Sequence, residues 1–586
     1  MRRTKIVCTI GPASSSPEML RALIRNGMNV ARLNFSHGAL EQHRASIAEI
    51  RAASAELDQP VAVLADLQGP KLRVGQIGGD GVLLETSSQV TLTTEPIVGR
   101  PGVIPVQYDD LPKSVEVGHA ILLDDGLIEL RVLAVTEKEI RCRVVVGGTI
   151  ISNKGINLPY APISMPAITA KDREDLAFAL REQVDWIAMS FVRTADDVRA
   201  LQELIRAESA FGRATPLIAK IEKPEGVRNI DAILEASDGI MVARGDLGIE
   251  SPVEEVPLVQ KMIIAKCNRV GKPVITATQM LDSMMRNPRP TRAEASDVAN
   301  AILDGSDAIM LSGETAIGKY PLEALRTMAR IAEHTEQGAA LNGSAKREAG
   351  RHRTVAEAVA HASCQTAQDL DAAAIITPTA SGLTPRLVSM FRPAVPIVAV
   401  TPSPMIQRQL ALLWGVYPLL AQRAESTDKM IAGALQAAVA HDLVKPGDIV
   451  VVTAGAPGER LAAAPTNLMK VQRIERILAQ GTGIGQRVVR GRVRLIAPDD
   501  VLGARVDMEE IVVVRKTDRS FVSLVQRASG LITEEGDAAS HAAILALELG
   551  VPAIVGVRDA TRLLRDGQEI TLDPATGRIY EGYAQF

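Results

Sequence analysis

The stretch from Leu217 to Gly248 narrows the range of folds open to this chain. It reads as strand, turn, helix, strand and turn, and charged residues stand at the end of both strands. Lys220 and Glu222 end the first strand, where side chains two residues apart share a face, and Asp246 follows the second. Neighbouring parallel strands lie about 4.8 Å apart, so the two carboxylates could meet on one Mg²⁺ or Mn²⁺ ion. The alternative is a surface Lys–Glu pair and an aspartate that caps a helix.

Strand-like segments of the same kind recur along the chain, with helical segments between them. They begin near Thr4, Asn29, Val61, Asp185, Pro216, Gly239, Pro273 and Ala308. Eight such units predict an α/β fold, a (β/α)₈ barrel over residues 1–67 and 166–338, whose active site lies at the carboxyl ends of the strands. The alternative is an open doubly wound sheet, but such a sheet rarely has eight units with polar residues at nearly every strand end.

Residues 68–165 interrupt this rhythm. They contain β-branched alternation, as in residues 127–146, and turn signals such as Asp124-Asp125-Gly126. The pattern predicts a small antiparallel β-barrel inserted in a loop of the larger barrel. Because a domain inserted at the carboxyl end of a barrel strand lies over the active site, we expect this domain to act as a closing lid.

Two further domains are predicted after the barrel. Residues 339–353 have the composition of a linker and open a compact α/β domain that we expect to span residues 339–477. The Gly-rich segment 479–486 predicts a second linker, and residues 487–586 a final domain.

Composition and charge exclude several classes of function. The net charge is −4 and aromatic residues make up 3% of the chain, so neither a nucleic acid nor an anionic membrane is expected as a partner. The four cysteines are far apart and form no CxxC motif, which disfavours a disulfide framework or a zinc site. No apolar run approaches the roughly 20 residues of a membrane helix, and no signal peptide is recognisable, so we expect a cytoplasmic location.

Two motifs in the central stretch resemble the signature of pyruvate kinase. They are KIEKPEG at residues 220–226 and VARGDLGIE at residues 242–250, and the resemblance covers about residues 1–475. It implies transfer of the phosphoryl group of phosphoenolpyruvate to ADP, dependence on Mg²⁺ or Mn²⁺, and a homotetramer.

Two other hypotheses stand beside this one. Another enolate-forming barrel enzyme, such as a phosphoenolpyruvate mutase or a citrate-lyase-type aldolase, would share the metal carboxylates but lack the lid. A catalytically silent sensor of phosphorylated metabolites is disfavoured by the intact catalytic set of Lys220, Glu222, Asp246 and Thr278.

The resemblance assigns roles to residues at the barrel mouth. Glu222 and Asp246 would hold Mg²⁺, while Lys220 would neutralise the phosphoryl group in flight. Arg32 would contact phosphate as a guanidinium fork. The substrate carboxylate would bind backbone N–H groups where a helix begins, at residues Ala243, Arg244, Gly245 and Asp246.

Three further residues match family motifs near this site. The resemblance places the Thr278 hydroxyl beside the methylene carbon of the substrate, as part of a proton relay. The alternative is an ordinary strand threonine that shares a face with Thr276. Ser312 and Glu314, in the motif LSGET, are expected behind the site, with barrel packing as the alternative.

Polar residues from the barrel and the lid are expected to contact the nucleotide phosphates. By resemblance these residues are Asn34, His37, Arg73 and Lys154. The alternative is a solvated surface, or for His37 a turn or helix cap.

One position departs from relatives that require K⁺. Lys71 stands where those relatives usually carry Glu, although the oxygen cluster expected for a monovalent cation remains, at Asn34, Ser36, Asp66 and Leu67. An ammonium group there could act in place of K⁺, so we predict activity with Mg²⁺ and no requirement for K⁺. The alternative is a surface lysine at the lid hinge.

The third domain contains a loop typical of phosphate binding. A Ser/Thr/Gly loop that leads into a helix can cradle a phosphate, and this one resembles the allosteric loop of the family. Its residues are Thr377, Thr379, Ser381, Gly382 and Thr384. Many relatives have Lys where Leu383 stands, so we expect a monophosphorylated small-molecule effector, or none, rather than a doubly phosphorylated sugar.

The last domain resembles the mobile, swivelling phosphohistidine domain of enzymes that use phosphoenolpyruvate. Its motif is Ala539-Ser540-His541-Ala542-Ala543, and the resemblance makes His541 the candidate phosphohistidine. The chain contains no recognisable ATP-grasp partner domain, so a structural or regulatory role is favoured, with a phosphocarrier as the alternative.

Overall fold

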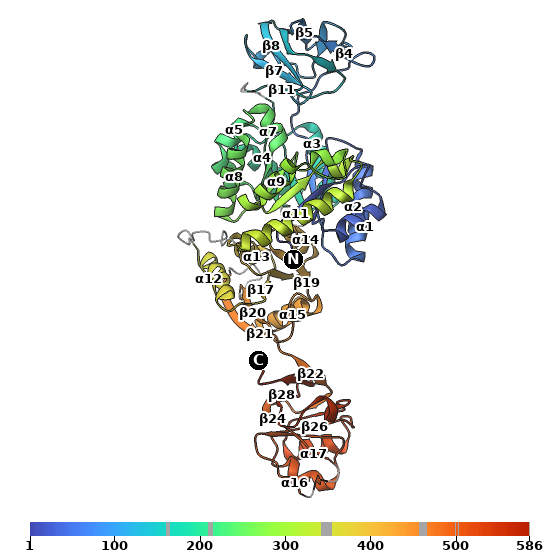
Figure 1. The fold of residues 1–586 in the computed structure, drawn as a ribbon, viewed down its shortest axis with the longest axis vertical. Helices are drawn as coiled ribbons and strands as arrows, with labels where there is room; N and C mark the ends of the chain where they lie inside the picture. The colour runs from blue at the N-terminus through green and yellow to red at the C-terminus, as the bar shows by residue number, and fades with distance from the viewer. Residues whose placement is uncertain are drawn as a thin grey trace. The chain divides into compact units, whose positions relative to one another are not determined.

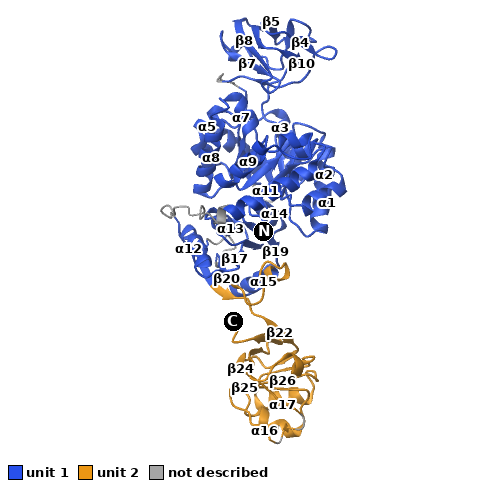
Figure 2. Ribbon diagram, viewed as in Figure 1, with its two compact units in different colours: residues 1–437, 451–470 blue, residues 438–450, 471–586 orange. Residues whose placement is uncertain are grey.

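The computed structural model describes residues 1–159, 165–208, 215–341, 354–455, 466–497, 500–501 and 503–584. It divides into two compact units (Figure 2). Unit 1 comprises Met1–Ala437 and Val451–Lys470, and unit 2 comprises Ala438–Val450 and Val471–Phe586. No helix of the described residues is long and apolar enough to span a bilayer.

Eight parallel strands close into a barrel in unit 1, which confirms the predicted (β/α)₈ fold. The strand order is β1-β16-β15-β14-β13-β12-β3-β2. Each strand begins within one residue of its predicted start: β1 Lys5–Thr9, β2 Val30–Asn34, β3 Ala62–Asp66, β12 Trp186–Met189, β13 Leu217–Ile221, β14 Gly239–Ala243, β15 Val274–Ala277 and β16 Ala308–Leu311.

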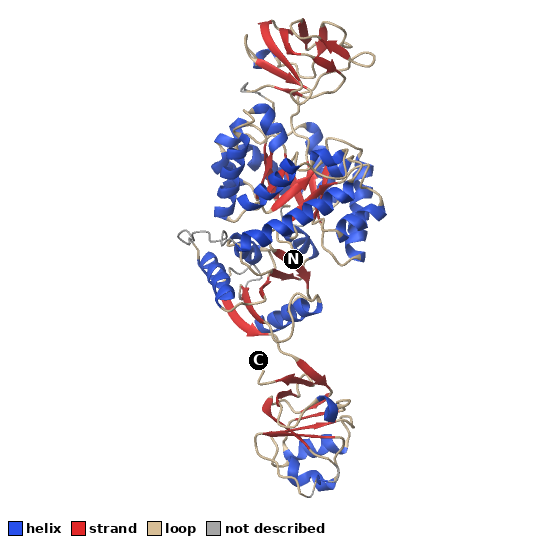
Figure 3. Cartoon of the chain, viewed as in Figure 1, coloured by secondary structure: helices blue, strands red, loops and turns tan. Residues whose placement is uncertain are grey.

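Helices surround these strands (Figures 1 and 3). The first shows why they form: Ser16 caps the backbone N–H of Met19, Pro17 occupies the first helical position, and one face of the helix is buried. The outer helices are α1 Pro17–Arg25, α2 Leu40–Glu56, α3 Ala170–Arg181, α4 Ala195–Glu208, α6 Ile230–Ala236, α8 Val256–Val270, α9 Arg292–Asp304 and α11 Pro321–Leu341. Shorter helices follow the carboxyl ends of three strands and shape the barrel mouth: α5 Pro224–Arg228, α7 Arg244–Glu250 and α10 Gly313–Ala316.

The inserted segment forms a six-stranded sheet, β11-β7-β8-β9-β5-β6, and a two-stranded sheet, β10-β4. Its pairs are antiparallel except for β5 with β6, which run parallel. A separate apolar core that includes Leu92, Ile104 and Leu130 holds it together. The strands are β4 Val82–Leu84, β5 Gln89–Thr93, β6 Val103–Pro105, β7 Ala120–Leu123, β8 Ile128–Val135, β9 Glu139–Val146, β10 Gly148–Ile150 and β11 Ile156–Asn157.

A five-stranded sheet of order β19-β18-β17-β20-β21 follows the barrel. Of the linker expected at 339–353, residues 342–353 lie outside the described residues, and α11 extends to Leu341. The elements are α12 Val355–Asp369, β17 Ala374–Pro378, α13 Leu383–Met390, β18 Ile397–Thr401, α14 Pro404–Leu410, β19 Val416–Leu420, α15 Thr427–Ala440, β20 Ile449–Ala454 and β21 Leu468–Arg473.

The final sheet has eight strands, in the order β22-β29-β28-β24-β25-β26-β27-β23. The prediction of a linker at 479–486 is wrong, because these residues include the end of β22 and all of β23. Thr482–Ile484 of β23 pair with Ala553–Val555. The elements are β22 Ile477–Gln480, β23 Thr482–Ile484, β24 Val489–Leu495, β25 Glu510–Val514, α16 Val522–Val525, β26 Gly530–Thr533, α17 His541–Leu549, β27 Ala553–Val555, α18 Ala560–Leu563, β28 Glu569–Asp573 and β29 Arg578–Glu581.

Candidate active site

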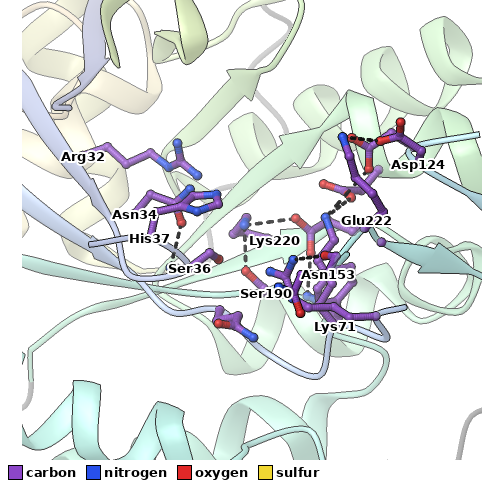
Figure 4. Close-up of a pocket in the computed structure, with 17 residues that line it drawn as sticks. Arg32, Asn34, Ser36, His37, Lys71, Asp124, Asn153, Ser190, Lys220 and Glu222 are labelled. Atoms are coloured by element: carbon purple, nitrogen blue, oxygen red, sulfur yellow. Dashed lines mark hydrogen bonds and ion pairs between the residues drawn. The ribbon is translucent and has the colours of Figure 1, made fainter. Parts of the chain in front are cut away.

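A buried cluster of charges lies at the carboxyl ends of β2, β3, β12 and β13. The Lys220 Nζ atom lies 2.7 Å from Ser190 Oγ and 3.0 Å from Glu222 Oε1 (Figure 4). It also lies 3.1 Å from Asp66 Oδ1. Arg32 Nε donates to the other oxygen of Asp66 at 2.6 Å. The parallel register brings these residues together, since Arg32 aligns with Leu64 and Asn34 with Asp66 across β2 and β3.

The charges in this cluster set one another's ionisation. Burial alone would raise the pKa of Asp66, but the cationic groups of Lys220 and Arg32 outweigh it and lower that pKa. Burial alone would lower the pKa of Lys220, but Asp66 and Glu222 outweigh it and raise that pKa. Lys220 is therefore held as a cation at neutral pH.

Glu222 has the opposite balance. Burial raises its pKa, Lys220 opposes this, and the nearby carboxylate of Asp246 raises the pKa further. One of its oxygens also accepts a hydrogen bond from the backbone N–H of Phe191 at 2.6 Å. Glu222, with its raised pKa, and the second carboxylate of Asp246 are a donor set that fits a divalent cation, with substrate oxygens or water as the other ligands.

A single cleft of about 240 Å³ brings barrel and lid residues of unit 1 together. All four predicted nucleotide contacts line it, as do Arg32, Lys220, Glu222 and Asp246 (Figure 4). The full lining is Arg32, Asn34, Ser36, His37, Gln68, Lys71, Arg73, Asp124, Asp125, Asn153, Lys154, Gly155, Ser190, Phe191, Lys220, Glu222 and Asp246.

The lid cations are held by neighbouring lid groups. Lys154 Nζ lies 2.7 Å from Asp124 Oδ1, and Arg73 Nη1 donates to the backbone oxygen of Asn153 at 3.0 Å. The exposed His37 has a lowered pKa, because of partial burial and the positive charge of Arg73 and other nearby cations. A neutral imidazole in this position can donate to or accept from a ligand oxygen.

Lys71 lies beside Asp246 in the cleft. Its Nζ atom is 3.9 Å from both Asp125 Oδ1 and Asp246 Oδ1, while no described contact joins it to the expected monovalent-cation oxygens. The oxygens of Leu67, Asn34 and Asp66 are engaged within the chain. Leu67 O accepts from Ser190 Oγ at 2.7 Å, Asn34 Oδ1 accepts from Ser36 N at 3.1 Å, and Asp66 is paired with two cations.

Thr278 follows the end of β15 and does not continue it. Its φ of +69° breaks the strand alternation, so the expectation that it shares a face with Thr276 is wrong. The hydroxyl accepts from Gly245 N at 2.7 Å and donates to Ala277 O at 2.6 Å. Arg244 turns to Asp297 at 2.7 Å. Ala243, Arg244, Gly245 and Thr278 thus adjoin the cleft without being among its described lining residues.

Sequence reasoning missed Ser190, although it follows barrel strand β12 as a polar residue in the run DWIAMSFV. That position was the signal that could have identified it. Glu314 lies in the first turn of α10, and its expected place behind the site remains a prediction. It is buried, and it accepts backbone N–H groups of Leu281 at 3.0 Å and Ser312 at 2.7 Å.

The predicted effector residues divide into two groups. The Thr377 hydroxyl is buried on β17 and donates to Val398 O, and the Thr384 hydroxyl is bonded to Thr466 at 2.8 Å. Thr379, Ser381 and Gly382 form the loop itself, where Thr379 Oγ1 accepts from Gly382 N at 2.9 Å.

The candidate phosphohistidine begins a helix in unit 2. His541 is the exposed first residue of α17, and its Nδ1 atom lies 2.9 Å from Thr517 Oγ1.

Comparisons with known proteins agree with this geometry. Residues 1–325 match the pyruvate kinase barrel domain, residues 357–472 the pyruvate kinase alpha/beta domain, and residues 506–577 the mobile domain of PEP-utilising enzymes. The chain is 50% identical over 587 residues to a pyruvate kinase of Geobacillus stearothermophilus, which covers 100% of this chain and 99% of the relative. It is 49% identical over 585 residues to pyruvate kinase 2 of Synechocystis, with coverage of 99% and 98%.

A solved structure is also similar. The crystal structure of a pyruvate kinase from Cryptosporidium parvum has a TM-score of 0.74 and 40% identity, and the match covers 81% of this chain and 96% of that one. Sequence identity near 50% over the full length and matching domains in the same order show that the chain belongs to the pyruvate kinase family.

Proposed function

We propose that this pyruvate kinase transfers the phosphoryl group of phosphoenolpyruvate to ADP at the cleft between barrel and lid, with a divalent ion on Glu222 and Asp246. The observation that carries the proposal is the buried Lys220, which is kept cationic beside both Asp66 and Glu222. A phosphoryl group in transfer resembles metaphosphate and needs fixed positive charge around it.

Mg²⁺ or Mn²⁺ would supply charge neutralisation for the phosphate and the developing enolate when bound. The chain's own residues do the rest. Lys220, at the carboxyl end of β13, would face the transferring group. Arg32 is the second cation, and it is fixed by Asp66 and by Thr9 at 2.9 Å. Neither side chain has to reorganise during the reaction.

The lid completes the nucleotide side of the cleft. Arg73 and Lys154 present cations for the ADP phosphates, and each is already oriented by a lid oxygen. Proton delivery to the enolate carbon is assigned to the Thr278 hydroxyl, which lies beside Gly245 at the start of α7. Its present hydrogen bond to Ala277 O would have to be exchanged for one to the substrate or to a relaying water.

We further propose that Lys71 replaces K⁺. Its ammonium group lies 3.9 Å from Asp246 Oδ1, so a permanent positive charge stands beside the metal carboxylate. Three of the oxygens expected at the K⁺ site, those of Asn34, Asp66 and Leu67, already have donors or cations within the chain.

An assay of pyruvate formation with and without KCl at fixed ionic strength tests this proposal. We expect the rate of the natural chain to change by less than about twofold, since the fixed ionic strength also holds general screening constant. Lys71→Glu should create a K⁺ requirement by placing a carboxylate where the ammonium stands. The matched control is Lys138→Glu, the same change on an exposed lid lysine paired with Glu95. Strong K⁺ activation of the natural chain would rule the proposal out.

A further inference from the structure

Three buried polar side chains meet just behind the cleft, and the mechanism above does not use them. They are Glu250, Lys223 and Asn157, with exposed fractions of 2%, 8% and 5%. A single oxygen, Glu250 Oε1, accepts from Lys223 Nζ at 3.0 Å and from Asn157 Nδ2 at 3.0 Å. We refer to them as the Glu250 cluster.

The cluster joins the two segments that carry the metal carboxylates. Lys223 directly follows Glu222, after β13. Asp246 lies in the first turn of α7 and Glu250 is the last residue of that helix. Since one helical turn is a rigid unit, the ion pair between Lys223 and Glu250 fixes where Asp246 stands relative to Glu222.

The third member comes from the lid. Asn157 ends β11, which pairs with β7 of the lid sheet. Lys71, which also belongs to the lid, lies 3.9 Å from both Asp125, in the turn after β7, and Asp246 of the same helix. The helix that carries Asp246 is therefore linked to the lid near both of its ends.

The cluster is poorly explained by stability alone. Buried ion pairs contribute little net stability, because desolvation offsets their attraction. Asn157 Oδ1 is also buried without a hydrogen-bond partner among the described residues, an arrangement that costs free energy. An apolar side chain would pack there without that cost, so the amide N–H to Glu250 is the feature that needs an explanation.

We propose that Glu250 is a positioning residue that sets the spacing of Glu222 and Asp246 for a divalent ion and couples this spacing to the lid through Asn157. The inference rests on the metal site of the proposed function. Residues that hold metal ligands in place typically change metal affinity or activity about 10- to 100-fold when they are replaced.

Mn²⁺ binding tests the proposal without an activity readout. Free Mn²⁺ is measured by electron paramagnetic resonance during titration of the full chain with Mn²⁺ alone. Lys223→Met and Glu250→Gln should each raise the dissociation constant about tenfold. Asn157→Leu should raise it about threefold, and the Asn157→Leu/Glu250→Gln double variant no further than Glu250→Gln, because coupled residues are not additive.

Lys261→Met is the matched control, because it removes an ion pair with Asp304 on the outer helices. It should bind Mn²⁺ as the natural chain does. The double variant Lys223→Met/Glu250→Gln leaves no lone buried charge, so it should keep the thermal midpoint of the metal-free natural chain while still binding Mn²⁺ weakly.

Folded variants with unchanged Mn²⁺ affinity would overturn the proposal. Failure of the uncharged double variant to fold would also overturn it, by assigning the cluster to stability. Glu222→Gln separates this result from a failure of the proposed function. If Glu222→Gln leaves Mn²⁺ affinity unchanged, the metal site itself is misplaced, whatever the Glu250 variants do.

Discussion

At the residue scale, Leu383 bears on our expectation of which effector the third domain would bind. It begins α13 directly after the loop of Thr379, Ser381 and Gly382, and its side chain is 40% exposed. The loop offers hydroxyl and N–H donors, which suffice for one phosphate. An exposed aliphatic side chain at the loop edge offers nothing to a second phosphate, where a lysine would.

We therefore expect weak or no activation by fructose 1,6-bisphosphate, and any response to come from a monophosphate such as ribose 5-phosphate or AMP. Titration of the initial rate with each compound measures this. Leu383→Lys should lower the bisphosphate concentration needed for half-maximal activation about fivefold, because one exposed ion pair changes affinity by about that factor. Leu383→Met serves as the uncharged control. A strong response of the natural chain to the bisphosphate alone would disprove the assignment.

At the scale of elements, Gly483 in β23 and Gly481 between β22 and β23 explain why a linker was predicted and a sheet was found. A Cβ atom on Gly481 would lie 2.6 Å from Val555 O, and one on Gly483 would lie 1.7 Å from Pro574 O. Glycine within a strand often marks a close approach of another backbone. Composition alone cannot distinguish such glycines from those of a flexible segment, because the approaching backbone comes from more than 70 residues away.

Gly483→Ala should therefore destabilise the final sheet, because backbone atoms of Pro574 have no rotamer by which to move aside. We expect a loss on the order of 1–3 kcal/mol, the usual cost of overpacking. The loss in free energy of unfolding is measured by chemical denaturation, with the hydrogen exchange of backbone amides in residues 477–584 as the readout. Gly503→Ala is the control, since the nearest atom to the added Cβ would be Asp500 O, 4.0 Å away. Equal stability of the two variants would contradict this account of the strand.

The barrel and much of its mouth could be predicted because the signals are local. The buried apolar runs predict the strands. The charged residues that follow them, in Lys220-Ile221-Glu222 and Arg244-Gly245-Asp246, predict the candidate site. Other features depend on distant partners. The positive φ of Thr278 follows from its bond to Gly245, and the position of Lys71 follows from Asp125 of the lid. Neither of these contacts can be predicted from the spacing of residues along the chain.

At the scale of unit 1 as a whole, the amino-terminal end of the barrel is sealed by the third domain. Leu412 belongs to the same buried cluster as Trp186 in the barrel interior. Asp185 is held between Arg51 and Arg408, both at 2.8 Å. Lys5 of β1 donates to Val416 O at 2.5 Å and lies 4.8 Å from the Tyr417 ring. The barrel and the third domain therefore share one buried junction.

Lys5 makes the stability of this junction depend on pH. Burial, and then the charge of Arg2, lower its pKa from 10.5 to about 7, and Glu336 opposes this in part. Between these values the unfolded chain binds more protons than the folded chain, so the free energy of unfolding rises with pH. Lys5 therefore lowers the stability most below about pH 7.

Lys5→Met should raise the free energy of unfolding at pH 7 by on the order of 2 kcal/mol, after the loss of the bond to Val416 O is allowed for. The gain should shrink towards pH 10, because the folded lysine is already neutral there and the unfolded lysine approaches its own pKa of 10.5. Urea denaturation at the two pH values measures this. Lys319→Met removes a lysine from the same barrel away from this junction and is the control. A gain that is independent of pH would contradict the assigned titration.

The most direct test of the central claim is the rate of pyruvate and ATP formation from phosphoenolpyruvate and ADP by Lys220→Gln, measured beside Mn²⁺ binding to the same variant. The account predicts a kcat about 10²- to 10³-fold below that of the natural chain, since a fixed charge at the transferring group is lost, while Mn²⁺ remains bound on Glu222 and Asp246. A folded variant that binds Mn²⁺ and retains the natural kcat would contradict it.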